Sequence, residues 1–580
     1  MNGLNSVMTV GVDDSRLDSL RRESYRIAIV GCGPRGLYCL DSLSQELVRR
    51  QSGRYGTHFV EEQRFRDEGD LPNSEMPRRL EIVIFEPSPH PGAGVVYALD
   101  QPRHLRMNFA TQFIDAWIDD PHRSPEQLNL TNWLALRYPE YGSPQGYAPR
   151  SIVGEYLHDC FQHVLRRTTQ FADVVHRQEQ VTDITRVGQG WRVRTANEVM
   201  DVDEVVLAIG HEGWHCSQSA IKPLANQQYI ASVFPVREKL SPERVPRGCS
   251  VAVRGFGLTW IDAALSLTEG RGGRFEASGN GFIYHASGDE PRVLCPFSRT
   301  GRPMLAKPIR SRLDIPRQVD EIWETGRKLL GTLPKPVCKT RFHADILRPI
   351  LNAAERVLDT MESEGNVQVW WDDWRTNAFT PRRALDEIQR SIAVAHGESP
   401  PTPAWALAEA WRHLYPALIE LVSHGGLTED AWEEFQPVAT EMERIAYGPP
   451  AENLARIVAL IEAGIVDLQY VASPNGMQNQ DDFDVIINAV IPAANAPAPN
   501  GPLSKLLDNS EIRPLNRFTG IEIDSAGCPQ SKTGETPPRL AIFGRTTEGC
   551  VLGNDTLSRR MHPHIENWAA KTVATLTSDL

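Results

Sequence analysis

The feature that most constrains this chain is a glycine-rich turn between a short apolar run and a helix-spaced segment, at residues 25–43. The run predicts a buried parallel strand, and the spacing after the turn predicts a helix. In such a unit Gly31 permits a tight turn, Gly33 lets backbone approach a diphosphate, and Gly36 lets the helix pack on the strand. The helix N-terminus, at Pro34, favours an anion. We therefore predict a dinucleotide pyrophosphate site; a glycine turn without ligand is the alternative.

Three later positions fit the same site. Glu86 ends a predicted strand, where an acidic residue holds the ribose of an adenine dinucleotide, although an insertion stretches its distance from the glycines to about 50 residues. A second glycine turn around Gly94 follows, and a later apolar strand ends at Gly210, as expected where the chain returns beneath the dinucleotide. A solvated strand-end carboxylate is the alternative for Glu86.

A second apolar strand is followed by a similar glycine turn and helix. Gly255 and Gly257 occupy the first two glycine positions, but Trp260 replaces the third, which predicts looser helix packing or a shifted ligand. After the next predicted strand, Arg299 and Arg302 suit a ribose 2′-phosphate, because guanidinium pairs bidentately with phosphate oxygens. The sequence thus predicts a second nucleotide site that favours NADPH over NADH, with two surface arginines in a turn as the alternative.

Composition narrows the function classes. The 580 residues suggest several domains, and the net charge of −13 argues against a general nucleic-acid or anionic-membrane binder. The sequence shows no apolar signal core and no apolar membrane span, so we expect a cytoplasmic protein without a membrane partner. The nine cysteines are scattered singly, so we expect neither a metal nor structural disulfides. Cys32 and Cys39 are interpreted as packing residues rather than a redox pair.

Six motifs together resemble the FAD-NAD(P)-binding family of flavoproteins with two dinucleotide-binding domains. They are GCGPRGL, PxxGAGVVY, LAIGH, RGFGLT, SRTGRP and GRTTEGCVLGNDT. The resemblance implies FAD at the first glycine turn and NADPH at the second. In the closing motif, Gly544, Asn554 and Asp555 are expected to return to the flavin ring. A strand and helix that merely complete the fold are the alternative for this segment.

A narrower similarity, to the N-hydroxylating monooxygenases for ornithine and lysine, lies at residues 105–157. Those enzymes carry Met-Gln near the flavin; here Met107-Asn108 stands in that place, with a shorter amide. The resemblance implies that Met107 lies at the cofactor and that Asn108 is a catalytic candidate near the ring, although a structural amide is the alternative. For an acidic substrate, Arg106, Arg150 and Lys307 are the candidate anchors, and spacing does not choose among them.

The resemblance implies an FAD-dependent, NADPH-using monooxygenase of a secondary-metabolite biosynthetic pathway. It would oxidise the amino group of a small molecule with molecular oxygen, through a C4a-hydroperoxyflavin, and aspartate is the nearest analogy. Two alternatives stay open: a flavin oxidase or dehydrogenase without pyridine-nucleotide use, suggested by Trp260, and a non-enzymatic nucleotide-binding scaffold. A homo-oligomer is compatible with the sequence.

The predicted fold is α/β, with two Rossmann-like dinucleotide-binding domains and a mainly helical insertion. The expected parts are an N-terminal tail at 1–24, the first part of the FAD-binding domain at 25–245, the NADPH-binding domain at 246–312, a helical insertion or cap at 313–480 and a C-terminal return at 481–580 that completes the FAD-binding domain.

Overall fold

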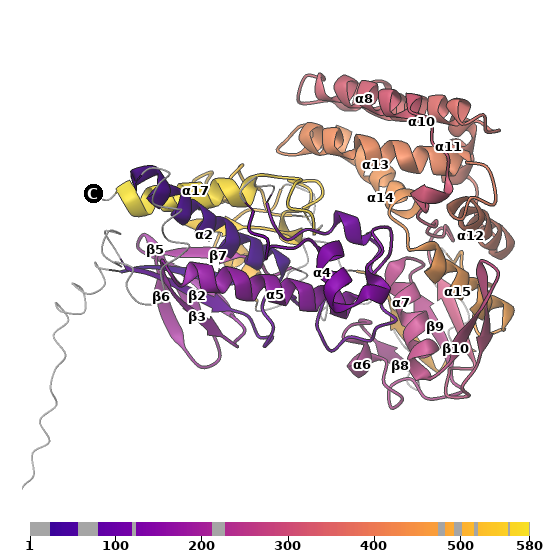
Figure 1. Ribbon diagram of the computed structural model, residues 1–580, viewed down its shortest axis with the longest axis horizontal. Coiled ribbons are helices and arrows are strands. Elements are labelled where there is room, and N and C mark those ends of the chain that lie inside the picture. Colours follow the sequence, from indigo (N-terminus) through magenta and orange to yellow (C-terminus); the bar gives the residue numbers. More distant parts are fainter. Residues whose placement is uncertain are drawn as a thin grey trace, which may run out of the picture.

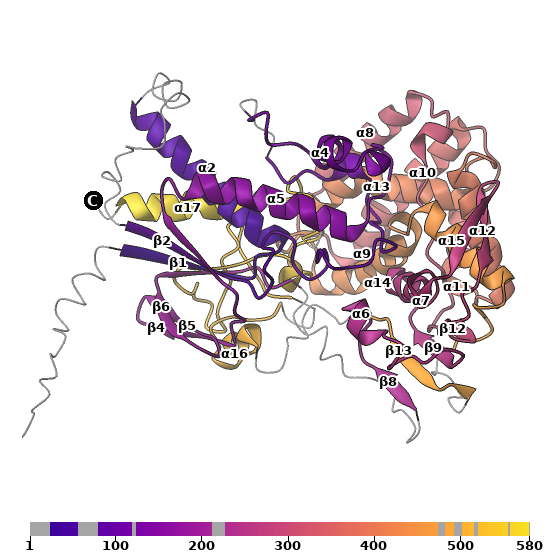
Figure 2. The same cartoon turned by 60° about the horizontal axis from the view of Figure 1, so that its bottom comes forward.

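The computed structural model describes residues 24–55, 79–118, 123–210, 227–473, 482–491, 501–515, 520–554 and 557–578. It contains two parallel sheets and a large helical region. The first sheet lies at one end of the molecule, and the second sheet lies with the helical region at the other (Figure 1; Figure 2). The predicted α/β fold class is confirmed.

The first sheet has the strand order β14-β7-β1-β2-β3, and all neighbouring strands are parallel. This is the order of a doubly wound dinucleotide fold, with the switch point between β1 and β7. The strands are β1 (Ser24–Val30), β2 (Arg79–Phe85), β3 (Asp173–Arg177), β7 (Glu204–Leu207) and β14 (Leu540–Ile542).

Alternation along β1 sends side chains to both faces of this sheet, so both faces are covered. Ile27 and Ile29 join one buried cluster with residues of α2, α5 and α17, whereas Ala28 and Val30 join another with residues of β5. These elements are α2 (Pro34–Tyr55), α5 (Arg150–Thr168), α16 (Pro502–Asp508), α17 (His564–Ser578) and an antiparallel sheet of β4 (Asp183–Val187), β5 (Gly190–Arg194) and β6 (Val199–Val202).

A buried carboxylate joins the two ends of the chain at this sheet. Glu204, the first residue of β7, accepts hydrogen bonds from Tyr25 Oη at 2.8 Å and from Trp568 Nε1 at 2.6 Å. Thr572 Oγ1 donates a third, at 2.8 Å. The C-terminal helix α17 is therefore fastened to the first strand through one side chain.

The second sheet is also parallel, with the order β12-β9-β13-β8. Its strands are β8 (Gln228–Ile230), β9 (Ser250–Arg254), β12 (Val293–Phe297) and β13 (Val485–Asn488); α6 (Val236–Lys239), α7 (Leu258–Leu267) and the hairpin β10 (Arg274–Ser278) and β11 (Gly281–His285) accompany them. The switch point lies between β9 and β13, because the chain crosses to opposite sides of β9 to form β12 and β13.

Two of the expected domain boundaries differ from the structure. Strand β8 lies inside the range 25–245 and β13 inside 481–580, both assigned to the first fold, but both pair in the second sheet. The reason is that strand partners far apart in sequence decide sheet membership, and a short apolar strand carries no mark of its partner.

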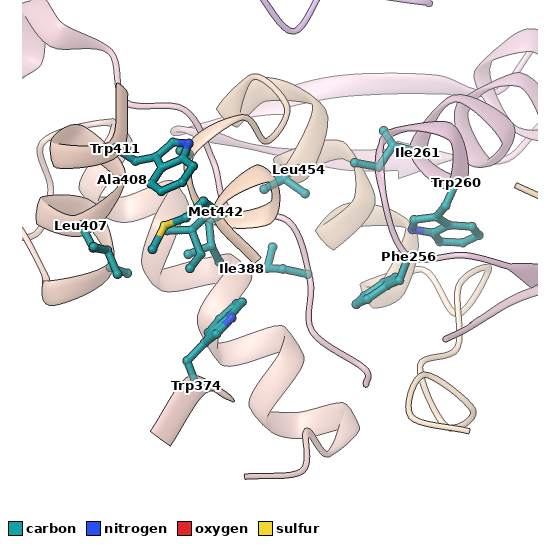
Figure 3. Packing of buried hydrophobic residues seen from close by; sticks show 14 of the residues in the cluster. Phe256, Trp260, Ile261, Trp374, Ile388, Leu407, Ala408, Trp411, Met442 and Leu454 are labelled. Atoms are coloured by element: carbon teal, nitrogen blue, oxygen red, sulfur yellow. The ribbon is translucent and has the colours of Figure 1, made fainter. Parts of the chain in front are cut away.

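The helical region shares one core with the second sheet. Trp260 and Ile261 of α7 belong to the same buried cluster as Trp374 and Trp411, and Figure 3 shows side chains from both parts. The helices are α8 (Gln318–Gly331), α9 (Lys339–Arg341), the π-helix η7 (Phe342–Leu347), α10 (Arg348–Thr360), α11 (Val367–Thr376), α12 (Pro381–Ala395), α13 (Pro403–Val422), α14 (Glu429–Ala446) and α15 (Ala451–Glu462); α4 (Leu130–Arg137) precedes α5. No helix of the described residues is long and apolar enough to cross a membrane.

Candidate cofactor and substrate site

The first glycine turn is closely packed at the switch point of the first sheet. Gly31 has φ 85°, and a Cβ added there would lie 2.6 Å from the Ala208 carbonyl oxygen. A Cβ at Gly36 would lie 2.4 Å from the Gly31 carbonyl oxygen. Both glycines are therefore required by sterics, and Pro34 begins α2 directly above the turn.

The second glycine loop lies against the first. A Cβ at Gly94, which has φ 66°, would lie 3.0 Å from Gly33 Cα. The Gly92 amide donates to the Cys32 carbonyl oxygen at 2.6 Å. The two glycine loops thus meet where a diphosphate would approach the N-terminus of α2. This arrangement of exposed backbone fits a dinucleotide.

Glu86, at the end of β2, is buried and faces the same turn. Its Oε2 accepts a hydrogen bond from the Cys32 amide at 2.8 Å, and its Oε1 accepts one from the Ser88 amide at 3.0 Å. Each carboxylate oxygen has a further lone pair for a ribose hydroxyl. The assignment of Glu86 to the ribose stays a prediction.

The chain returns to this turn at two more places. Gly210, with φ 63°, follows β7 at the same edge of the sheet. A Cβ at Gly544 would lie 3.5 Å from Arg35 Cγ, and Arg35 Nη2 donates to the Asn554 carbonyl oxygen at 3.0 Å. The structure therefore brings Gly544 and Asn554 to the first glycine turn, while Asp555 lies outside the described residues.

The second glycine turn is more open. Gly255 has φ 120° and would bring a Cβ to 3.0 Å from the Ala489 carbonyl oxygen, at the switch point beside β13. At Gly257 the nearest atom to an added Cβ is Met304 Sδ, at 3.8 Å. Trp260 is buried and packs near Phe256, with ring centroids 6.5 Å apart.

The two arginines predicted for a 2′-phosphate differ in the structure. Arg302 Nη1 pairs with Glu441 Oε1 at 3.0 Å, and its Nε and Nη2 donate to the carbonyl oxygens of Trp374 and Arg375. Its guanidinium is thus engaged within the protein, which argues against its assignment to phosphate. Arg299 is exposed in the turn after β12, so the prediction rests on this residue.

Asn108 and Lys307, 199 residues apart, meet between the two nucleotide folds. Lys307 Nζ donates to the Asn108 carbonyl oxygen, and Asn108 Nδ2 donates to the Tyr447 carbonyl oxygen at 3.4 Å. The ammonium lies 5.5 Å from the ring centroid of Phe109 and 5.8 Å from that of Tyr447. Next to Asn108, Met107 is buried and donates its amide to the Ala148 carbonyl oxygen at 2.9 Å. We call Asn108, Phe109, Lys307 and Tyr447 the central cluster.

The helical region and the closing segment reach the central cluster through tyrosines. The rings of Tyr415 and Tyr447 contact each other edge to face, 5.6 Å between centroids. A Cβ at Gly553 would lie 3.3 Å from Tyr415 Cε1. Sequence reasoning missed both tyrosines: Tyr415 belongs to a helix-spaced set in residues 405–422 that indicates core packing, and Tyr447, at the end of α14, belongs to no motif.

The other two candidate anchors are placed differently. Arg150 Nη1 pairs with Asp262 Oδ2 at 2.7 Å, and its Nε donates to the Arg106 carbonyl oxygen. The guanidinium of Arg106 lies over the Tyr141 ring, 5.0 Å from the centroid. Arg150 is therefore neutralised inside the protein, and Arg106 packs on an aromatic face.

The cysteines of the first glycine turn are buried among apolar neighbours. Burial raises the pKa of the Cys32 and Cys39 thiols, which disfavours the reactive thiolate. Among the described residues, no group of three or more histidine, cysteine, aspartate or glutamate side chains is arranged to hold a metal ion.

Comparison with known proteins finds a family model that matches part of the first fold. Residues 28–212 match the FAD-NAD(P)-binding family, which confirms the predicted FAD-NAD(P)-binding domain. Nitrosuccinic acid synthase npaA of Aspergillus oryzae is 26% identical over 513 residues, covering 76% of this chain and 72% of the relative. The L-aspartate N-monooxygenase (nitrosuccinate-forming) of Streptomyces davaonensis is 26% identical, covering 84% and 85%. Among solved structures, ornithine N-hydroxylase of Kutzneria sp. 744 aligns over 95% of this chain and 99% of its own, with 12% identity and a TM-score of 0.41.

Proposed function

We propose that this protein is an FAD-dependent, NADPH-using monooxygenase that oxidises the amino group of an amino acid, with aspartate as the first substrate to test. The observation that carries the proposal is the pair of glycine turns at the switch points of two parallel sheets, with the central cluster between the folds. The names of the relatives support an amino-acid amine.

The net first oxidation inserts one oxygen atom of dioxygen into an N–H bond of the amine. The other oxygen leaves as water, and NADPH supplies the two electrons. The chemistry that FAD supplies when bound is the activation of dioxygen with those electrons. Glu86 and the backbone of Gly31, Gly33 and Gly94 would hold FAD, and Gly255, Gly257 and Arg299 would hold NADPH.

The central cluster would orient the amine and exclude water. Asn108 is fixed by two contacts, because its carbonyl accepts from Lys307 and its amide donates to Tyr447. A fixed amide beside an aromatic wall offers a polar contact at a constant position, which is what an oriented amine requires. Asn108 remains our candidate for the polar contact near the flavin.

The test is a spectrum followed by turnover. The purified protein is expected to be yellow, to be reduced faster by NADPH than by NADH without oxygen, and to consume oxygen with hydroxylamine or further oxidised product when aspartate is added. A colourless protein that recovers no FAD would refute the proposal. NADPH-independent oxidation of the amine would instead identify the flavin oxidase or dehydrogenase alternative.

A further inference from the structure

Lys307 is held rigidly where the second fold meets the helical region. Its amide donates to the Pro449 carbonyl oxygen at 3.0 Å, and it forms a parallel bridge with Pro450. Close by, a Cβ at Gly448 would lie 1.9 Å from the Leu305 carbonyl oxygen, so the two segments touch without room for a side chain. Contacts with residues 448–450 therefore hold the backbone of Lys307 in place.

The ammonium of Lys307 has no counter-ion among the residues that the structure describes. In the part of the chain that the structure describes, the Asn108 carbonyl is its one hydrogen-bond acceptor, and it forms no ion pair with a carboxylate. An ammonium has three N–H donors, so two remain for another group. The aromatic rings of Phe109 and Tyr447 stabilise the charge only partly.

Three arginines of the described residues are paired with carboxylates, whereas Arg106, whose guanidinium lies over the Tyr141 ring, is not. Arg412 pairs with the buried Glu409, Arg302 with Glu441 and Arg150 with Asp262. Burial, together with repulsion from Arg412, lowers the pKa of Lys307 to about 7. A buried cation without a partner is costly, so a site that keeps one fits an anionic ligand.

We propose that Lys307 binds the side-chain carboxylate of the substrate, which neutral and basic amino acids lack, and thereby selects acidic amino acids. This inference rests on the proposed function, because it places the substrate beside Asn108. The two unused N–H donors reach the carboxylate oxygens, while Phe109 and Tyr447 form apolar walls beside the carbon chain. A basic amino acid would bring a second ammonium toward Lys307 and be repelled.

The experiment measures anchoring separately from oxygenation, with succinate as the probe, because it carries carboxylates and no amine. Calorimetry of succinate binding is performed on the FAD-loaded wild type and on Lys307→Met, with Lys307→Arg as the conservative variant. We expect the dissociation constant to rise by about 10- to 100-fold in Lys307→Met, the range of a charge-assisted hydrogen bond, and to recover partly in Lys307→Arg. Lys328→Met, which removes an exposed lysine of α8, is the matched control and should bind as the wild type does.

Steady-state kinetics give the second readout. In Lys307→Met the KM for aspartate is expected to rise by a similar factor, with FAD content and the KM for NADPH unchanged. An unchanged succinate affinity would overturn the inference, and so would loss of FAD from both Lys307 variants, which would assign the lysine to the cofactor.

The two proposals fail in different ways. A wild-type enzyme that oxygenates a neutral or basic amine and does not bind succinate refutes the carboxylate site and leaves the monooxygenase standing. An enzyme that binds succinate through Lys307 but oxygenates no amine refutes the proposed function and leaves the carboxylate site standing.

Discussion

The two glycine turns of this protein share a motif but differ in how tightly they close. At the first turn the Leu37 amide donates to the Gly33 carbonyl at 3.0 Å; at the second, the Ile261 amide and Gly257 carbonyl are 3.4 Å apart. Trp260 occupies the third glycine position of the second turn, where its expected effect on helix packing agrees with this longer contact. The turn with all three glycines thus closes more tightly than the turn in which Trp260 replaces the third, and we expect the first turn to hold its cofactor more tightly than the second.

The largest effect is expected from alanine substitutions that test this difference directly. Gly36→Ala places a Cβ against the Gly31 carbonyl, so we expect loss of bound FAD and of soluble protein. Gly257→Ala meets no atom closer than 3.8 Å, so it should retain FAD and raise only the KM for NADPH. FAD content is measured as flavin absorbance per mole of protein, and the KM for NADPH by steady-state kinetics. Equal loss of FAD in the two variants would contradict the expected difference between the two turns.

A smaller effect is expected at the arginines beside the second turn. Arg299→Ala should raise the KM for NADPH by about 10-fold or more and leave that for NADH unchanged, since only NADPH carries the 2′-phosphate. Arg302→Ala should instead lower the thermal midpoint, because it removes the ion pair with Glu441 and leaves that carboxylate only Trp374 and the more distant Arg444. Kinetics with NADPH and with NADH test the role of Arg299 in binding the 2′-phosphate. Thermal denaturation tests the structural role of Arg302. A selective NADPH defect in Arg302→Ala would reverse the assignment.

The KM for the substrate is expected to depend on pH in the neutral range, because Lys307 titrates there. Lys307 carries its charge below its pKa of about 7 and loses it above, whereas Tyr147, whose pKa is raised by burial to about 12, stays neutral. The KM for aspartate should therefore rise by about tenfold between about pH 6 and pH 8 in the wild type and stay flat in Lys307→Arg. FAD retention should not change over this range. A pH-dependent loss of FAD would place the titrating group at the first turn instead.

The smallest effect is expected within the helix of the first turn. Cys39→Ala removes a buried sulfur, which should cost about 1 kcal/mol and lower the melting temperature by a few degrees. NADPH-driven turnover should not change, because the thiol packs and takes no part in electron transfer. Loss of turnover with FAD still bound would give Cys39 a redox role.

Local signals predicted the nucleotide folds well. The apolar strand, the glycine spacing and the helix that follows are all encoded within about 20 residues, and the structure forms them as β1, the turn and α2. Glu86 was identified by context despite the long insertion, and its carboxylate does face the glycine turn.

Contacts between distant segments could not be predicted in the same way. The membership of β8 and β13 in the second sheet depends on pairing across more than 200 residues. Arg302 looked like a phosphate ligand because its partner, Glu441, lies in a helix with no motif. The fold separates the three candidate anchors: Arg150 pairs with Asp262, Arg106 packs over the Tyr141 ring, and Lys307 pairs with no carboxylate of the described residues.

Strand β14 gives the first sheet one edge, and it is made from residues 540–542. A ribosome therefore synthesises four strands of this sheet long before the fifth emerges, and until then β7 exposes an unpaired row of amides and carbonyls. The second fold and the helical region, which lie between β7 and β14 in the sequence, are free to fold in that interval. The first domain to begin is thus the last to be completed.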